Sequence, residues 1–101
     1  MITIVNKHNM PSEPATTIYC GRGSALGNPF AMGSAASRNA VCDQYEGWFK
    51  KRLNTDFQPF HDQLRKILKA HREGDVYLQC FCAPLRCHCE TIKDYIESQE
   101  D

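Results

Sequence analysis

The sequence predicts a small α/β protein, a three-layer Rossmann-like sandwich in which about three helices pack on a mainly parallel sheet of three strands or slightly more. Two observations predict this class. Apolar residues recur with period 2 or 3.6 along the chain, in the order strand, strand, helix, helix, strand, helix. The last of these strands, residues 75–81, is apolar on both faces, and strands buried on both sides are typical of parallel sheets.

Two short strands are expected near the start of the chain. Residues 2–5 alternate apolar and polar side chains, and residues 16–20 form a second run rich in β-branched residues. Residues 6–15, between them, contain asparagine, serine and proline and are expected to form a loop. Residues 21–36 are too rich in glycine and proline for regular structure, and a long loop inside a compact domain usually has a function.

Three helices are expected, each with an apolar stripe that would face the core. The first runs from a cap at Ser37 to about residue 53, the second starts near Pro59 and ends before Gly74, and the third spans about residues 88–97. The three stripes are Val41, Tyr45, Trp48 and Phe49; Phe60, Leu64, Ile67 and Leu68; and Ile92, Tyr95 and Ile96.

Length and composition indicate a single globular domain over residues 1–101. The apolar share is 42% and the charged share 24%, which are ordinary values for such a domain. No segment approaches the roughly 20 apolar residues that a membrane span needs, and the N-terminus lacks the apolar core of a signal peptide. We therefore expect no membrane partner and a cytoplasmic location (the host cytoplasm for a phage-encoded chain), where the six cysteines stay reduced.

The charge balance argues against a general polyanion binder, because 12 basic side chains are matched by 12 acidic ones. The distribution is uneven, since residues 50–72 contain seven basic side chains against two acidic ones. A basic helical face of this kind either meets nucleic acid or is simply solvated, and both interpretations stay open.

The segment 21–30, Gly-Arg-Gly-Ser-Ala-Leu-Gly-Asn-Pro-Phe, is the first candidate site. Its glycines expose N–H groups that can form an anion-binding nest, and its arginine and serine add donors suited to phosphate or carboxylate. An arginine at the start of the first helix would add a second cation beside a helix N-terminus. The candidate ligand-binding residues are Gly21, Arg22, Gly23, Ser24, Gly27, Asn28 and Arg38. The alternative is a structural loop with exposed arginines.

Four cysteines fall between residues 80 and 89, at the end of the last strand. On an extended strand Cys80 and Cys82 would project to the same face about 7 Å apart, and Cys87 would return at the helix start, with His88 or Cys89 as a fourth ligand. Zinc prefers four such ligands in a tetrahedron. The candidate metal ligands are Cys80, Cys82, Cys87 and His88, with zinc as the candidate cofactor. Two alternatives stay open: inert cysteines packed in the core, and a Cys87 thiol activated by the helix N-terminus.

His88 and Glu90 are the candidate catalytic residues, because both lie beside the end of a strand at the start of the last helix. Glu90 would accept a hydrogen bond from a ribose hydroxyl or stabilise an oxocarbenium-like centre. His88 would hold a phosphate or act as a general acid. The structural alternative is an acidic residue that is favourable near a helix N-terminus, next to a capping histidine.

Together these segments resemble a small family of unknown function found widely in phages and bacteria. The resemblance covers most of residues 16–96. It rests on a Tyr-x-Gly-Arg-x-Ser-x-Leu-Gly-Asn-Pro-Phe segment at 19–30, on Arg38, Tyr45 and Trp48, and on a C-x-C-x-P-x-x-C-H segment formed by Cys80, Cys82, Pro84, Cys87 and His88. Members usually continue with Gly-Asp where this chain has Cys89 and Glu90. The resemblance therefore marks Cys89 as a local addition and keeps a carboxylate at position 90, but it implies no reaction.

The leading hypothesis is a nucleotide- or phosphosugar-binding domain with a pocket between the loop 21–30 and the junction 82–90. Its partner would be a small phosphorylated ligand, and N-glycosidic cleavage or ribosyl transfer is the chemistry that best suits these residues. The anion would be held by Arg22, Ser24 and Arg38, and the sugar would meet His88 and Glu90. The alternative is a small zinc-binding module, without catalysis, that engages a host protein or nucleic acid. A thiol-based redox protein is a third interpretation.

Overall fold

The computed structural model describes residues 1–30, 38–81 and 86–99. Its three strands are β1 (Ile2–Asn6), β2 (Thr16–Tyr19) and β3 (Val76–Cys80), and its three helices are α1 (Arg38–Leu53), α2 (Gln58–Glu73) and α3 (Cys89–Ser98). The predicted α/β class and the predicted order of elements are confirmed. β3 ends at Cys80, and Cys82, which the sequence placed on the same strand, lies outside the described residues.

The three strands form one parallel sheet in the order β1-β3-β2. β3 is therefore the central strand, which explains why its residues are apolar on both faces. The register pairs Ile4 with Leu78 on one side and Ile18 with Leu78 on the other. Because partnered residues in parallel strands point to the same face, these side chains form the apolar floor of the core.

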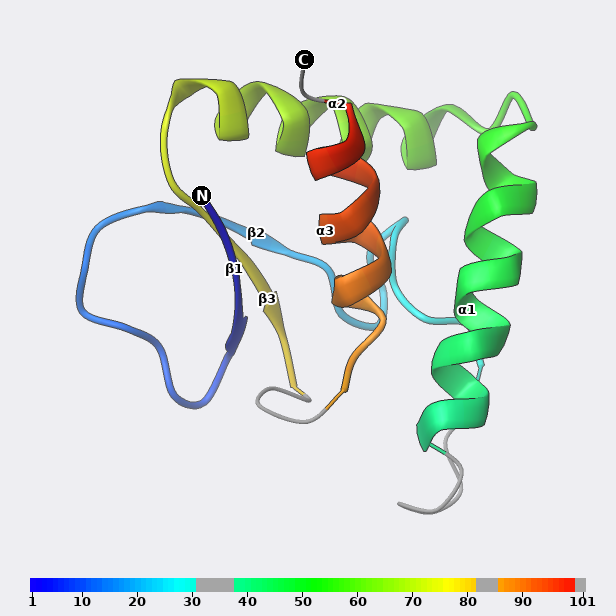
Figure 1. Cartoon of the computed structure of the whole chain (residues 1–101), viewed down its shortest axis with the longest axis horizontal. Helices are drawn as coiled ribbons and strands as arrows, with labels where there is room; N and C mark the ends of the chain where they lie inside the picture. Colours follow the sequence, from blue (N-terminus) through cyan, green and yellow to red (C-terminus); the bar gives the residue numbers. More distant parts are fainter. Residues whose placement is uncertain (31–37, 82–85, 100–101) are drawn as a thin grey trace.

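All three helices contribute to one core that covers this face of the sheet (Figure 1). α1 buries Tyr45 and Phe49, and α3 buries Ile92 and Ile96, at the spacing of a helix stripe. α2 has a proline in its first turn and buries Phe60, Leu64 and Ile67. The helix stripes predicted from the sequence thus supply the side chains that pack on the sheet.

The opposite face of the sheet is crossed by the segment 7–15, which is neither a helix nor a strand. β1 and β2 are parallel and lie on either side of β3, so the connection between them has to pass over one face (Figure 1). The Tyr77 hydroxyl donates to the Glu13 carbonyl at 3.0 Å, and Tyr77 points away from the helices. This segment therefore covers the side of β3 that the helices leave open.

Among the described residues, no helix is both long enough and apolar enough to cross a membrane.

Candidate functional site

The loop after β2 is a compact series of turns. The Ser24 N–H donates to the Gly21 carbonyl at 3.1 Å, and the Gly27 N–H donates to the Ser24 carbonyl at 2.9 Å. Gly23 has φ +93°, a left-handed conformation that favours glycine. A Cβ on Gly27 would lie 2.4 Å from the Gly21 carbonyl oxygen, so only glycine permits this approach. The N–H groups of Ser24 and Gly27 therefore close the loop on itself and are already bonded to loop carbonyls.

Arg22 closes the same loop with its side chain. Its guanidinium donates to the carbonyls of Asn28 at 3.1 Å and Phe30 at 2.9 Å. The Asn28 carboxamide oxygen in turn accepts the Phe30 N–H at 2.9 Å, so Asn28 orients this part of the loop. These bonds use two of the five N–H donors that a guanidinium carries.

Two side chains outside the predicted set of site residues hold the loop against the helices. Gln63 on α2 accepts the Leu26 N–H at 2.9 Å and donates to the Tyr19 carbonyl at 2.9 Å. Tyr45 on α1 is fully buried and donates its hydroxyl to the Leu26 carbonyl at 2.7 Å. Tyr45 was expected as a core residue, but nothing in the sequence signals its polar bond. A glutamine among the charged side chains of α2 carries no signal at all.

The loop and the cysteine-rich junction line one cavity of about 160 Å³. It lies where β2 and β3 end, which is the edge of a parallel sheet at which α/β proteins bind ligands. The loop contributes Gly21, Arg22 and Asn28, the junction contributes Cys80, Phe81 and His88, and α1 contributes Val41. Two segments about 60 residues apart in the sequence, the glycine loop and the junction after β3, therefore share one pocket.

A larger hollow, of about 330 Å³, lies between α1 and α3. Its walls are Phe49, Leu53 and Tyr95 together with charged side chains of both signs. Among the described residues, none from the glycine loop or from the cysteine segment reaches it. We therefore take the smaller cavity at the sheet edge as the candidate site, since chemistry-bearing residues converge there.

His88 forms the buried wall of the cavity and is only 6% exposed. Burial lowers the pKa of His88, and the nearby positive charge of Arg22 acts in the same direction. The imidazole is therefore neutral at pH 7. A carbonyl can only accept, so the contact of Nε2 with the Cys20 carbonyl places the proton on Nε2. Nδ1 is then the unprotonated nitrogen, and it lies 3.4 Å from the Cys87 sulfur.

Phe81 forms the aromatic rim of the cavity and is 47% exposed. Its ring packs at 5.3 Å from His8 and edge-on at 6.1 Å from Tyr19. The Lys7 ammonium lies over both Phe81 and Tyr19, at 5.6 and 5.2 Å from the ring centroids. Sequence analysis did not single out Phe81. An aromatic residue placed directly after a buried strand is the signal that could have found it.

Three other candidate residues make contacts outside the cavity wall. The Ser24 hydroxyl donates to the Gly21 carbonyl at 2.7 Å, and Arg38 donates to the Arg86 carbonyl at 3.1 Å, next to Cys87. The Glu90 carboxylate accepts the Cys87 N–H at 3.0 Å, which caps the start of α3. Among the described residues, none of these three side chains lines the cavity.

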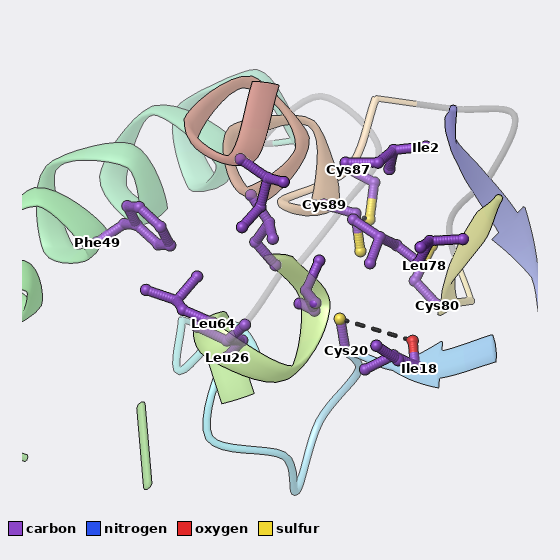
Figure 2. Packing of buried hydrophobic residues seen from close by; sticks show 14 of the residues in the cluster. Ile2, Ile18, Cys20, Leu26, Phe49, Leu64, Leu78, Cys80, Cys87 and Cys89 are labelled. Atoms are coloured by element: carbon purple, nitrogen blue, oxygen red, sulfur yellow. Dashed lines mark hydrogen bonds between the residues drawn. The ribbon is translucent and has the colours of Figure 1, made fainter. Parts of the chain in front are cut away.

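The cysteines at the junction form a buried cluster. The sulfur atoms of Cys80, Cys87 and Cys89 all lie within 4.8 Å of one another, and Cys87 and Cys89 lie side by side in Figure 2. This grouping could hold a metal ion. It keeps Cys80 and Cys87 of the predicted ligand set and adds Cys89, whereas Cys82 lies outside the described residues.

The thiols of Cys87 and Cys89 are protonated at neutral pH. Hydrogen bonding to the Cys80 thiol, together with burial, raises the pKa of the Cys87 thiol. Contacts with the thiols of Cys20, Cys80 and Cys87 raise the pKa of the Cys89 thiol in the same way. A reactive thiol requires a lowered pKa and solvent access, so this geometry argues against the redox interpretation.

Comparison with known proteins gives one match. The model of a family described as "Domain of unknown function (DUF4326)" matches residues 4–98. Searches of curated proteins and of solved structures returned no match. The family description states no source, so the phage origin expected from the sequence stays a prediction.

Proposed function

The chain belongs to the DUF4326 family, a family of domains of unknown function, and from the geometry of its site we propose that it binds a nucleotide or a phosphosugar. The observation that carries the proposal is the charge of the cavity at the sheet edge. Arg22 bears the only formal charge among the described residues that line it, because His88 is neutral. Arg22 is exposed, and a cavity whose described wall residues carry one exposed cation and no anion favours an anionic ligand.

The rim of the cavity favours a ligand with a flat ring. Phe81 is exposed at the mouth, and an exposed aromatic face stacks on nucleobases of any sequence. The volume of about 160 Å³ is below the range of pockets that enclose a whole drug-sized ligand. The phosphate and part of the sugar would occupy the cavity beside Arg22, and the base would lie outside it against Phe81.

The proposal does not include catalysis. N-glycosidic cleavage would need the Glu90 carboxylate to reach the sugar, whereas Glu90 caps α3 through the Cys87 N–H. His88 lies in the cavity wall with its Nε2–H bonded to Cys20. The proposal is therefore a binding function. A zinc ion held by the cysteines behind Cys80 and His88 would shape this wall without touching the ligand.

The test is calorimetric titration of the purified protein with inorganic phosphate, ribose 5-phosphate and the four common nucleoside monophosphates. We expect the monophosphates to bind more tightly than ribose 5-phosphate, because only they carry a ring for Phe81. Replacing Arg22 with Gln removes charge-assisted hydrogen bonds of about 1.5–3 kcal/mol, which corresponds to roughly 10- to 150-fold in Kd.

Two further variants separate binding from loop stability, since Arg22 also clamps the loop. Phe81→Ala should weaken the binding of the nucleotides and leave the binding of ribose 5-phosphate unchanged. Arg72→Gln, on the exposed surface of α2, is the matched control and should bind as the wild type does. Thermal unfolding of each variant shows whether the fold is intact. Absence of binding to all six probes by the wild type would refute the proposal.

A further inference from the structure

Four cysteine side chains from three segments meet behind the cavity wall. Cys20 directly follows β2, Cys80 ends β3, and Cys87 and Cys89 lie at the start of α3. None of the four is more than 3% exposed. Figure 2 shows Cys20 below the paired Cys87 and Cys89, with its sulfur directed toward them. Cys20 is fully buried, as a core cysteine would be, and its thiol donates to the Ile18 carbonyl at 3.6 Å, but the Cys89 thiol is also among its neighbours.

The sheet register brings Cys20 next to Cys80. β2 pairs with β3 as far as Tyr19 opposite Gln79, and the Cys20 N–H continues the ladder to the Gln79 carbonyl at 2.9 Å. Extending this register by one residue places Cys20 opposite Cys80. Side chains in that relation point to the same face of adjacent strands, which are about 4.8 Å apart. Both therefore face the helix layer, where α3 begins.

The start of α3 brings the other two sulfur atoms to the same point. The sulfurs of Cys80, Cys87 and Cys89 lie within 4.8 Å of one another, and the Cys89 thiol also contacts Cys20. In a tetrahedral zinc site with Zn–S bonds of about 2.3 Å, neighbouring sulfurs are about 3.8 Å apart. The group of Cys80, Cys87 and Cys89 needs a contraction of at most about 1 Å to reach that spacing, whereas Cys20 lies outside this group, beside Cys89, and its side chain has to move further to complete the tetrahedron.

We propose that this cluster binds one zinc ion through the thiolates of Cys20, Cys80, Cys87 and Cys89. A tetrahedron of four buried sulfur ligands suits zinc, and a site without an open position is structural. Binding releases the four thiol protons, because only thiolates are ligands. The ion joins β2, β3 and α3, the three segments whose ends form the cavity, so it fixes the geometry of the nucleotide site.

Hydrogen-bond donors already point at the sulfur atoms, as the negative charge of a four-thiolate site requires. The Cys89 N–H donates to the Cys87 sulfur at 3.5 Å, and the Gln63 amide donates to the Cys20 sulfur at 3.8 Å. The N-terminus of α3 adds the positive end of a helix dipole beside Cys87 and Cys89. Donors of this kind orient metal ligands and stabilise the thiolates.

His88 is assigned to the support of the site and not to its ligand set. Its Nδ1 lies 3.4 Å from the Cys87 sulfur and its Nε2 lies 3.8 Å from the Cys89 sulfur, but the Nε2–H is bonded to the Cys20 carbonyl, so this nitrogen is not free to bind a metal. The predicted ligand set of Cys80, Cys82, Cys87 and His88 differs from this one at two positions. The two sets can therefore be separated by substitution.

The experiment is titration of the reduced, metal-free protein with Co²⁺ and then Zn²⁺, followed by absorption spectroscopy and native mass spectrometry. Co²⁺ reports the number of thiolate ligands through its charge-transfer band and the tetrahedral geometry through its visible bands. We expect one ion per chain, a four-thiolate tetrahedral spectrum, and displacement of Co²⁺ by Zn²⁺. A wild type that binds no stoichiometric ion, or gives a spectrum with three sulfurs and one nitrogen, would overturn the proposal.

The variants locate the ligands. Cys20→Ser and Cys89→Ser should lower metal affinity by at least the order of 100-fold, since even second-shell changes reach that size. Cys42 is a buried cysteine of α1, so Cys42→Ser is the matched control. Cys42→Ser and Cys82→Ser should both keep the wild-type spectrum. A four-thiolate spectrum that survives Cys20→Ser, or that is lost in Cys82→Ser, contradicts the assignment. If a ligand variant does not fold, the ligand count from the wild-type spectrum still decides between the two sets.

Discussion

Gln63 is predicted to be the main polar link between the helix layer and the glycine loop, and its removal should destabilise the whole fold. One carboxamide accepts the Leu26 N–H and donates to the Tyr19 carbonyl, both at 2.9 Å. Leu26 is fully buried, so water cannot replace the lost acceptor. We therefore expect Gln63→Leu to lower the free energy of unfolding, although leucine is the more apolar residue.

The size of the effect follows from the two bonds. A buried N–H left without an acceptor costs about 1–3 kcal/mol, and the second hydrogen bond adds about 1 kcal/mol. The expected loss is about 2–4 kcal/mol, a large part of the roughly 5–15 kcal/mol that stabilises a typical domain. With an m-value of about 1.5 kcal/mol per M, the urea midpoint should fall by roughly 1–3 M.

The assay is urea unfolding at pH 7, followed by circular dichroism and by the fluorescence of Trp48, the single tryptophan. Gln44→Leu makes the same substitution at an exposed position of α1 and should shift the free energy of unfolding by no more than about 0.5 kcal/mol. A Gln63→Leu protein as stable as the Gln44→Leu control would refute the role assigned to Gln63.

Two further predictions concern the supports of the site. Tyr45→Phe removes the buried hydroxyl that donates to Leu26, so stability should fall by about 1–2 kcal/mol with no change in core volume; an unchanged urea midpoint would mean that this bond contributes nothing. Glu90→Ala removes the cap on the Cys87 N–H and should cost about 1 kcal/mol, whereas Glu90→Gln keeps an acceptor and should cost less. Equal losses in the two Glu90 variants would exclude the capping role.

The elements of the fold could be predicted because their signals are local. The stripe that contains Tyr45 and Phe49 follows from helical spacing, and the apolar run of β3 follows from its central place in the sheet. The meeting of the glycine loop and the cysteine segment could also be predicted, since both follow parallel strands and such strands end at one edge. Strand order and the crossing of the segment 7–15 depend on tertiary contacts and had no local signal.

The roles of individual site residues were harder to predict. For Arg22 and Glu90 the sequence is compatible with a structural role as well as with ligand binding. In the structure Arg22 donates to loop carbonyls, and Glu90 accepts the Cys87 N–H. Cys20 joins the cysteine cluster through the register of β2 against β3, and a register cannot be derived from two short strands with a long separation in sequence. Gln63 is a polar residue of the kind found on solvated helix faces. Its position facing the loop depends on how the loop packs against α2, which the sequence of α2 does not show.

Amide chemical-shift mapping of the ¹⁵N-labelled protein during titration with a nucleoside monophosphate shows directly whether the cavity at the sheet edge binds a nucleotide. A nucleotide bound there should cause saturable shifts at Gly21, Arg22, Phe81 and His88, which surround one cavity. These shifts should disappear in Arg22→Gln while the remaining spectrum stays that of the folded protein. Shifts confined to other surfaces, such as the basic side chains of α2, or no shifts at all, would contradict a nucleotide site at the edge of the sheet.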